Sequence, residues 1–392
     1  MHRKGVQIIQ CNYLRVLLKC THENNYEIPA TITDIYTDFV AVLLGKLEVK
    51  DKNGLLLFNI KRRLFTVLAL HMLDNNIYEI DLSFFKEFIN KFLIDRGYQL
   101  QNDDDINDLI EKSGLLYQDE NNMVGFKQIA FVEFLASVEI YHNQRDTHYK
   151  RLVENFNDIN WQNTAIFYAG QSKELVNMID DVVEKAPNLD IKDRFMNVGG
   201  MGYLSQALYQ TKPKDRKKLV FKSLDNLMNS INEIKEFTRD EKSLFYNMPY
   251  PLMLTIISFW FTENFKSITL KQTLVDSFGD LEMLNFESSK ESFENDLKLL
   301  IISSTLYNTY IADESYLLKL FDKPSFMKHP ILPLVADMII DLNNGTHLNP
   351  EYRRRIAKEI KKKREYIKDV LKEPAYRYGE DFIRDDDYSI SP

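Results

Sequence analysis

The sequence contains few of the residues that break regular structure or that stabilise small secreted domains. Its 392 residues include 13 glycines, 11 prolines and 2 cysteines. So few glycines and prolines argue against long disordered regions and favour a helix-rich globular class. Cys11 and Cys20 match no metal-binding spacing, so we expect free thiols in a reducing compartment.

Signals for secretion or membrane insertion are also missing. The N-terminal residues, MHRKGVQIIQCNY, lack the apolar core of a signal peptide. The longest nearly apolar run, Pro251 to Phe261, is too short to span a bilayer. We therefore expect a cytoplasmic protein. The net charge of -8 argues against binding of nucleic acid or anionic membranes over the whole surface.

No motif for catalysis occurs in the sequence. A Gly-x-x-x-x-Gly-Lys-Ser/Thr phosphate loop is absent, and the 7 histidines form no His-Glu-x-x-His or Cys/His cluster. Met178 to Asp181 resembles the acidic end of a Walker B strand, but the apolar residues around it have helical spacing. We predict that the chain is not an enzyme, and that it holds no catalytic residue, metal or cofactor of its own.

A hairpin followed at once by a helix is predicted between residues 114 and 142. Leu115 to Tyr117 and Met123 to Phe126 are short apolar runs, separated by a polar turn at 119–122. From Gln128 the apolar period changes from two to about 3.6. The helical face that this period predicts contains Phe131, Phe134, Leu135, Val138 and Tyr141. We expect Phe131 and Phe134 to be buried between this helix and the hairpin.

Three helices precede the hairpin in this prediction. The first spans residues 55–73, and its inward positions include Leu56, Ile60, Leu64, Leu68 and Met72. The second spans residues 82–94 and ends before Gly97, and a short third helix follows the acidic run 103–105. Together with the hairpin they make a winged-helix module. The acidity of the short helix would repel phosphates, which argues against DNA reading by this module.

Three segments resemble NACHT-type NTPases, which belong to the STAND class of signalling ATPases. Residues 126–136, FKQIAFVEFLA, resemble the family's F-x-H-x-x-F-x-E-F/Y-L-A signature, with Gln128 in place of the usual His. Residues 28–39, IPATITDIYTDF, are similar to a segment of the helical domain that follows the nucleotide-binding core. Residues 161–170, WQNTAIFYAG, are similar to the helix that opens the C-terminal array. The alternative for each segment is an ordinary helix whose aromatic residues belong to the core.

The predicted fold is mainly α: a winged-helix module with a small β-hairpin, followed by an irregular α-helical array. The domains expected from the resemblance are a helical segment at 1–50, the winged helix at 51–145, the array at 146–345, and a basic helix with an acidic tail at 346–392. The polar residues from 143 to about 160 are interpreted as a connector.

The resemblance also implies a function. In the family the winged helix packs over an ADP-bound core and holds it closed, and the array senses a ligand and permits oligomerisation. The chain would then be the regulatory part of such a protein, of bacterial origin and active in defence against phage. It would sense a foreign or host protein and use ADP or ATP only through an NTPase core, in cis or in trans. Gln128 would lie near the ADP, whereas Phe126, Phe131, Phe134, Leu135 and Trp161 would be structural.

A basic amphipathic helix is predicted from Tyr352 to Leu371. Its cations are Arg353, Arg354, Arg355, Lys358, Lys361, Lys362, Lys363 and Arg364. They either form a solvated face or bind a partner, which would be a phosphate-rich molecule or an acidic protein. This helix is the one place where the sequence favours nucleic-acid contact.

Two functions of other classes remain open. One is a winged-helix regulator that binds nucleic acid and carries a helical effector domain, for which duplex binding at low salt is the discriminating assay. The other is a plain helical scaffold, which would need no P-loop protein as a partner.

Overall fold

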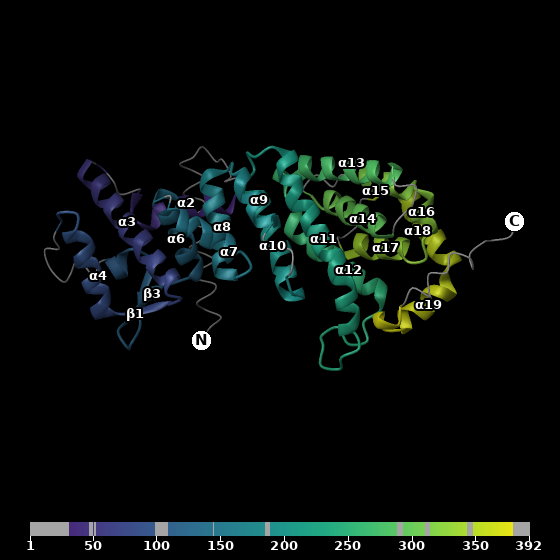
Figure 1. Ribbon diagram of the computed structural model, residues 1–392, viewed down its shortest axis with the longest axis horizontal. Helices are drawn as coiled ribbons and strands as arrows, with labels where there is room; N and C mark the ends of the chain where they lie inside the picture. Colours follow the sequence, from purple (N-terminus) through teal and green to yellow (C-terminus); the bar gives the residue numbers. More distant parts are fainter. Residues whose placement is uncertain are drawn as a thin grey trace. The chain divides into compact units, whose positions relative to one another are not determined.

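The computed structural model describes residues 31–46, 50, 52–98, 109–143, 145–184, 189–287, 293–309, 314–342 and 348–378. The chain is mainly helical and divides into two compact units, Met1–Leu175 and Val176–Pro392. Helices make up most of both units (Figure 1). The predictions for the first helix, for both cysteines and for the acidic run 103–105 lie outside the described residues.

The first described helix, α2 (Ile32–Leu43), begins where the sequence predicts a cap. Thr31 is the N-cap residue, and its hydroxyl oxygen accepts a hydrogen bond from the backbone N–H of Asp34 at 3.3 Å. This bond satisfies one of the N–H groups that a helix start leaves without a partner. The same hydroxyl donates to the Asp34 carboxylate at 2.9 Å, which holds the first turn together.

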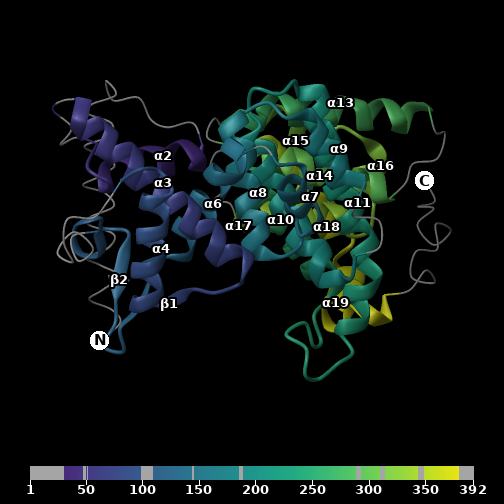
Figure 2. The ribbon, with the colours of Figure 1, turned by 60° about the vertical axis from the view of Figure 1, so that its left-hand side comes forward.

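The predicted hairpin is part of a three-stranded sheet. Strands β2 (Leu116–Gln118) and β3 (Met123–Phe126) pair antiparallel, with Tyr117 opposite Gly125. Strand β1 (Glu79–Asp81), which the sequence did not predict, pairs antiparallel with the other edge of β3. The sheet order is therefore β1-β3-β2, and β1 joins α3 (Lys52–Asp74) to α4 (Leu82–Ile94). Figure 2 shows these strands beside α3 and α4.

Helix α3 differs from its prediction at its first turns. Leu64, Leu68 and Met72 are buried as predicted, but Leu56 is 47% exposed. Its neighbours Leu55 and Leu57 are exposed as well. The inward face of α3 thus begins after these leucines.

Helix α6 (Ile129–Asn143) is the centre of the first unit. The sequence predicts an amphipathic helix, but every residue from Phe131 to Ile140 is buried, including Glu133 and Glu139. Helix α6 packs against α3 on one side and α8 (Ile159–Ser172) on another, so no face remains for water. A helix that is buried all round belongs to a core, and its polar residues then need partners inside the protein.

The predicted connector after α6 is also a helix. Helix α7 (Asp146–Glu154) buries Leu152 and Val153, and it contacts α8. The first compact unit therefore continues through α8, which contains Trp161, whereas the domain prediction places residues 146–175 with the array.

The second unit is an irregular array of helices around an apolar core. Its helices before residue 343 are α9 (Val176–Glu184), α10 (Ile191–Ala207), α11 (Pro213–Phe237), α12 (Tyr250–Phe265), η2 (Ile268–Leu270), α13 (Lys271–Glu287), α14 (Phe293–Tyr307), α15 (Ser315–Phe321), α16 (Pro324–Lys328) and α17 (Leu332–Leu342). Helix α14 is central, because every residue from Asp296 to Tyr307 is buried. Among the described residues, no helix combines the length and apolar character needed to cross a bilayer.

The basic segment forms two helices where the sequence predicts one. Helix α18 (Pro350–Lys362) ends at Lys363, and α19 (Arg364–Lys372) begins directly after it. The Lys363 ammonium group donates to the carbonyl oxygens of Met327 at 2.9 Å and His329 at 2.8 Å. Because Lys363 is bound to the end of α16, the chain is anchored where the two helices meet. Past α19, Pro374 forms a β-bridge with Pro249, which lies just before α12.

Candidate functional site

The three segments that resemble the NACHT family lie in α2, α6 and α8, and their aromatic side chains meet. The Tyr36 ring lies 6.0 Å from Phe131, 5.8 Å from Phe134 and 5.1 Å from Phe167, measured between centroids. Phe39 stacks on Phe131 at 5.7 Å. We call this cluster of five rings the aromatic junction. It joins positions more than a hundred residues apart in the sequence.

The partners of Phe131 and Phe134 differ from those expected. Both side chains are buried, but their ring contacts go to α2 and α8, not to the hairpin. The hairpin instead contributes Phe126, which is buried and lies 6.3 Å from Phe65 of α3. The reason is the central position of α6, which offers one side to α3 and another to α2 and α8.

Two buried glutamates on α6 have different surroundings. Glu139 forms an ion pair with Arg63 and accepts hydrogen bonds from Thr66 Oγ1 at 2.7 Å and Asn143 Nδ2 at 2.6 Å. Among the described residues, Glu133 has no cation partner and accepts one hydrogen bond, from Asn163 Nδ2 at 3.0 Å. Burial raises the pKa of Glu133 to about 7, and the bond from Asn163 opposes this only in part. The α6–α8 contact thus contains a carboxyl group that titrates near neutral pH.

Gln128 and Trp161, two further residues singled out from the sequence, lie close in the chain to members of the aromatic junction. Gln128 is half-buried and immediately precedes α6, and its carbonyl oxygen accepts from the N–H of Phe131 at 3.1 Å. Its side chain makes no hydrogen bond to the residues that the structure describes. Leu135 is fully buried, and Trp161 is 9% exposed with the Arg151 guanidinium 4.6 Å above its ring.

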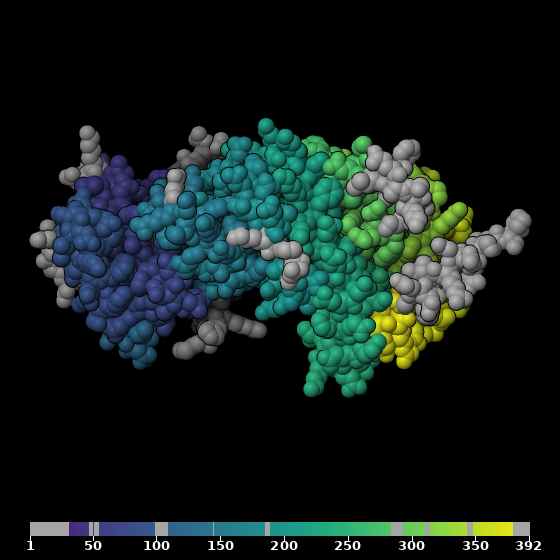
Figure 3. All heavy atoms as spheres, viewed as in Figure 1, coloured from purple at the N-terminus to yellow at the C-terminus, as the bar shows by residue number. Residues whose placement is uncertain are grey.

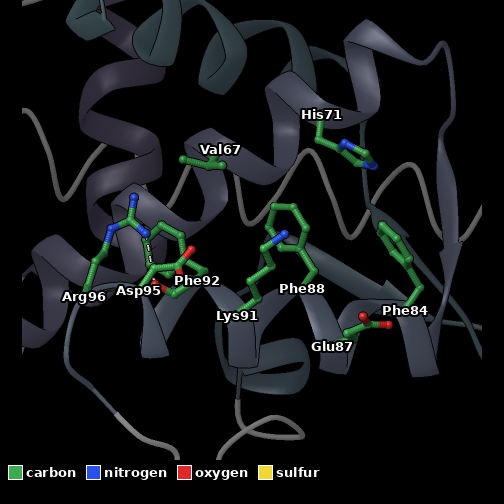
Figure 4. Close-up of a pocket in the computed structure, with 9 residues that line it drawn as sticks. All are labelled: Val67, His71, Phe84, Glu87, Phe88, Lys91, Phe92, Asp95 and Arg96. Atoms are coloured by element: carbon green, nitrogen blue, oxygen red, sulfur yellow. Dashed lines mark hydrogen bonds between the residues drawn. The ribbon is translucent and has the colours of Figure 1, made fainter.

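An open groove between α3 and α4 was not found by sequence reasoning. Its volume is about 420 Å³, and its floor includes Phe84, Phe88 and Phe92, each one turn further along α4 (Figure 4). His71 of α3 stacks on Phe84 at 5.6 Å. The Arg96 guanidinium lies 3.8 Å from the centre of the Phe92 ring. The four-residue spacing of the three phenylalanines is visible in the sequence and predicts one aromatic face on α4. The contribution of His71 could not be predicted in this way, because it comes from another helix.

The rim of this groove carries both signs of charge, from Glu87, Lys91, Asp95 and Arg96. Aromatic walls with a mixed-charge rim suit an apolar group that has polar neighbours. Within the described residues, no group of three His, Cys, Asp or Glu side chains could hold a metal ion.

The predicted basic residues belong to the second unit, on α18 and α19. They therefore form a separate candidate site from the aromatic junction. No protein-family model, curated protein or solved structure matches the chain.

Proposed function

We propose that this chain is the regulatory region of a NACHT-type signalling NTPase. The aromatic junction carries the proposal, because it unites the three segments that separately resemble this family. If the resemblance were accidental, nothing would require α2, α6 and α8 to share one core. Instead, the Tyr36 ring of α2 contacts both Phe131 of α6 and Phe167 of α8.

The first unit is proposed to contain a winged-helix module, with α2 before it and α7 and α8 after it. The order of its described elements along the chain is helix α3, strand β1, helix α4, and then strands β2 and β3. A sheet in the order β1-β3-β2 places the hairpin beside the strand between the two helices. This order of helices and strands supports the proposed winged-helix module.

Gln128 is proposed to face the phosphates of ADP in the NTPase core. It lies at the N-terminal end of α6, where the helix dipole favours an anion. Its amide offers two N–H donors but no charge. A hydrogen bond from this neutral amide would be about half as strong as a charge-assisted bond from a protonated histidine. Packing therefore contributes more to the closed state here than in relatives that have histidine.

The second unit is proposed to be the sensor. Its array of helices binds a foreign or host protein, and this binding releases the NTPase core for oligomerisation. The setting that fits is the cytoplasm of a bacterium under attack by phage. The chain needs no nucleotide of its own in this scheme.

Affinity capture from the source organism tests the proposal. The wild-type chain should retain a protein that contains a P-loop and bound ADP, and Gln128→Glu should weaken this capture by placing a carboxylate near phosphate. Gln118→Glu is the matched control, since Gln118 is an exposed residue of the same hairpin. Retention of partners that all lack a P-loop would favour a plain scaffold and contradict the proposal.

A further inference from the structure

Helices α18 and α19 concentrate positive charge on an acidic protein. Residues 350–372 contain ten lysines and arginines against four aspartates and glutamates, whereas the whole chain has a net charge of -8. Seven of these cations fall into two groups with different roles, and the other three pair with carboxylates of the same helices. In Figure 3, α18 and α19 are the yellow-green to yellow surface at the C-terminal end of the second unit.

The cations of the first group form ion pairs or hydrogen bonds with other residues of the second unit. Arg355 forms an ion pair with Asp322 at 2.7 Å and donates to the carbonyl oxygen of Phe321 at 2.9 Å. Arg353 pairs with Asp341, and Lys363 is bound to two carbonyl oxygens as described above. These three cations attach the helix pair to the array.

The second group faces solvent. Arg354, Lys358, Lys361 and Arg364 are exposed and make no ion pair or hydrogen bond to any residue that the structure describes. We call these four residues the basic stripe. The first three are spaced by four and three positions, which places them on one face of α18 over about 10 Å. The opposite face holds the fully buried Ile356.

The acidic residues of α18 and α19 form no ion pair with the basic stripe in the part of the chain that the structure describes. Glu359 pairs with Lys362 at 2.6 Å, and Glu365 pairs with Lys368 at 2.9 Å. Each of these carboxylates already has a cation of its own. The charges of the basic stripe therefore add, and they attract an anion with several regularly spaced charges.

The surroundings of the basic stripe narrow the class of partner. Leu371 is the one large apolar side chain among the described residues of α18 and α19 that is strongly exposed, so an apolar anchor for a protein or a membrane is lacking. The aromatic rings are engaged: Tyr352 lies under Arg355, and the Tyr366 hydroxyl bonds that of Tyr378 at 2.7 Å. Neither tyrosine ring of α18 and α19 is therefore presented for stacking on bases.

We propose that the basic stripe binds the sugar–phosphate backbone of a nucleic acid without reading its sequence. The contacts are ionic and made to phosphates, because lysine and arginine bind phosphates of any sequence and the tyrosine rings that could stack on bases are engaged within the protein. The acidic remainder of the protein limits the contact to this one surface. The proposal uses residues of the second unit alone and is independent of the NTPase.

Fluorescence anisotropy of the full chain with short labelled duplexes and single strands tests the proposal. At 50 to 200 mM salt, two unrelated sequences should bind equally well, and log K should fall with log salt with a slope of about -3 to -4 for the duplex, as four phosphate contacts predict. Lys358→Gln/Lys361→Gln should weaken binding about tenfold and reduce the magnitude of the slope by about two.

The matched control is Lys192→Gln/Lys214→Gln, which removes the same charge from exposed positions on α10 and α11. It should leave the slope unchanged and the affinity within about twofold. Equal losses in both variants, or no binding at the lowest salt, would overturn the proposal. So would stripe-dependent binding of polyglutamate, or of phosphatidylserine vesicles, in place of nucleic acid. Circular dichroism of all variants verifies that they are folded.

Discussion

Gly170 of α8 lies directly against Thr33 of α2. A Cβ atom at position 170 would come 2.0 Å from Thr33 Oγ1 and 2.6 Å from Thr33 Cβ. Both distances are far shorter than a van der Waals contact, so a methyl group at this position requires the two helices to separate. Gly170, the last residue of the segment 161–170, is thus the point where α2 crosses α8.

We therefore expect Gly170→Ala to destabilise the first unit by about 1–3 kcal/mol, as overpacking does. Thr33→Gly removes the atoms that clash, so the double variant should recover part of this loss despite the low helix propensity of glycine. A double-mutant cycle from urea unfolding measures the coupling. Additive effects of the two substitutions would mean that α2 does not pack on α8 as described.

Phe131 is the buried α6 residue of the aromatic junction that contacts both Tyr36 and Phe39. Phe131→Ala should cost about 3–5 kcal/mol of unfolding free energy, because it removes buried area and leaves a cavity beside these two rings. Phe84→Ala is the control in the same unit, since Phe84 is 39% exposed and should cost less than about 2 kcal/mol. Hydrogen exchange of the α6 amides in mild denaturant reports on this unit separately. Equal costs for the two substitutions would contradict the described core.

Glu133 should make the stability of the first unit depend on pH. Its pKa is raised in the folded state, so the folded protein binds the proton more tightly than the unfolded chain. The unfolding free energy then falls as the pH rises from about 4.5 to about 7, by at most ~3 kcal/mol. Glu133→Gln stays neutral and keeps an acceptor for Asn163. This variant should match the wild type near about pH 4 and exceed its stability near about pH 8.

The control for this pH dependence is Glu120→Gln, at an exposed position of the hairpin turn. Its stability difference from the wild type should stay constant across the same range. If Glu133→Gln gives no gain at alkaline pH, the Glu133 carboxyl is solvated and α6 is less buried than described.

The isolated chain should bind neither ATP nor ADP with micromolar affinity. No phosphate loop occurs in the sequence, and Met178 to Asp181 lie in helix α9 instead of a strand. Isothermal titration calorimetry with the magnesium nucleotides measures this directly. Heat of binding that a substitution between residues 176 and 210 abolishes would contradict the regulatory role.

The sequence predicted correctly those helices whose ends are fixed by residues next to them in the chain, such as a capping side chain or a glycine. Helix α4 begins and ends as predicted, because the Asp81 carboxylate accepts from the Ser83 N–H at 2.7 Å and Gly97 follows with a positive φ of 75°. Strand β1 could not be found in this way. It has three residues, too few for an alternating pattern, and it exists because β3 lies beside it.

The character of α6 depended on residues far along the chain. Two glutamates in a helical sequence predict a solvated side. Their partners, Arg63 and Asn163, come from α3 and α8, and only the fold brings them close. Similarly, the number of charges in the sequence does not show which cations have partners. Arg355 and Lys363 make contacts with the array, whereas the cations of the basic stripe are exposed, and only the fold distinguishes them.

The rate of ADP release tests the central proposal most directly. Release of a fluorescent ADP analogue would be followed for the captured NTPase alone, with the wild-type chain, and with Gln128→His. The wild-type chain should slow release, and Gln128→His should slow it further, most clearly near about pH 6, where imidazole gains a proton and a charge-assisted bond to phosphate. The same release rate in all three samples, at about pH 6 and at about pH 8, would contradict a regulatory contact between this chain and an NTPase core.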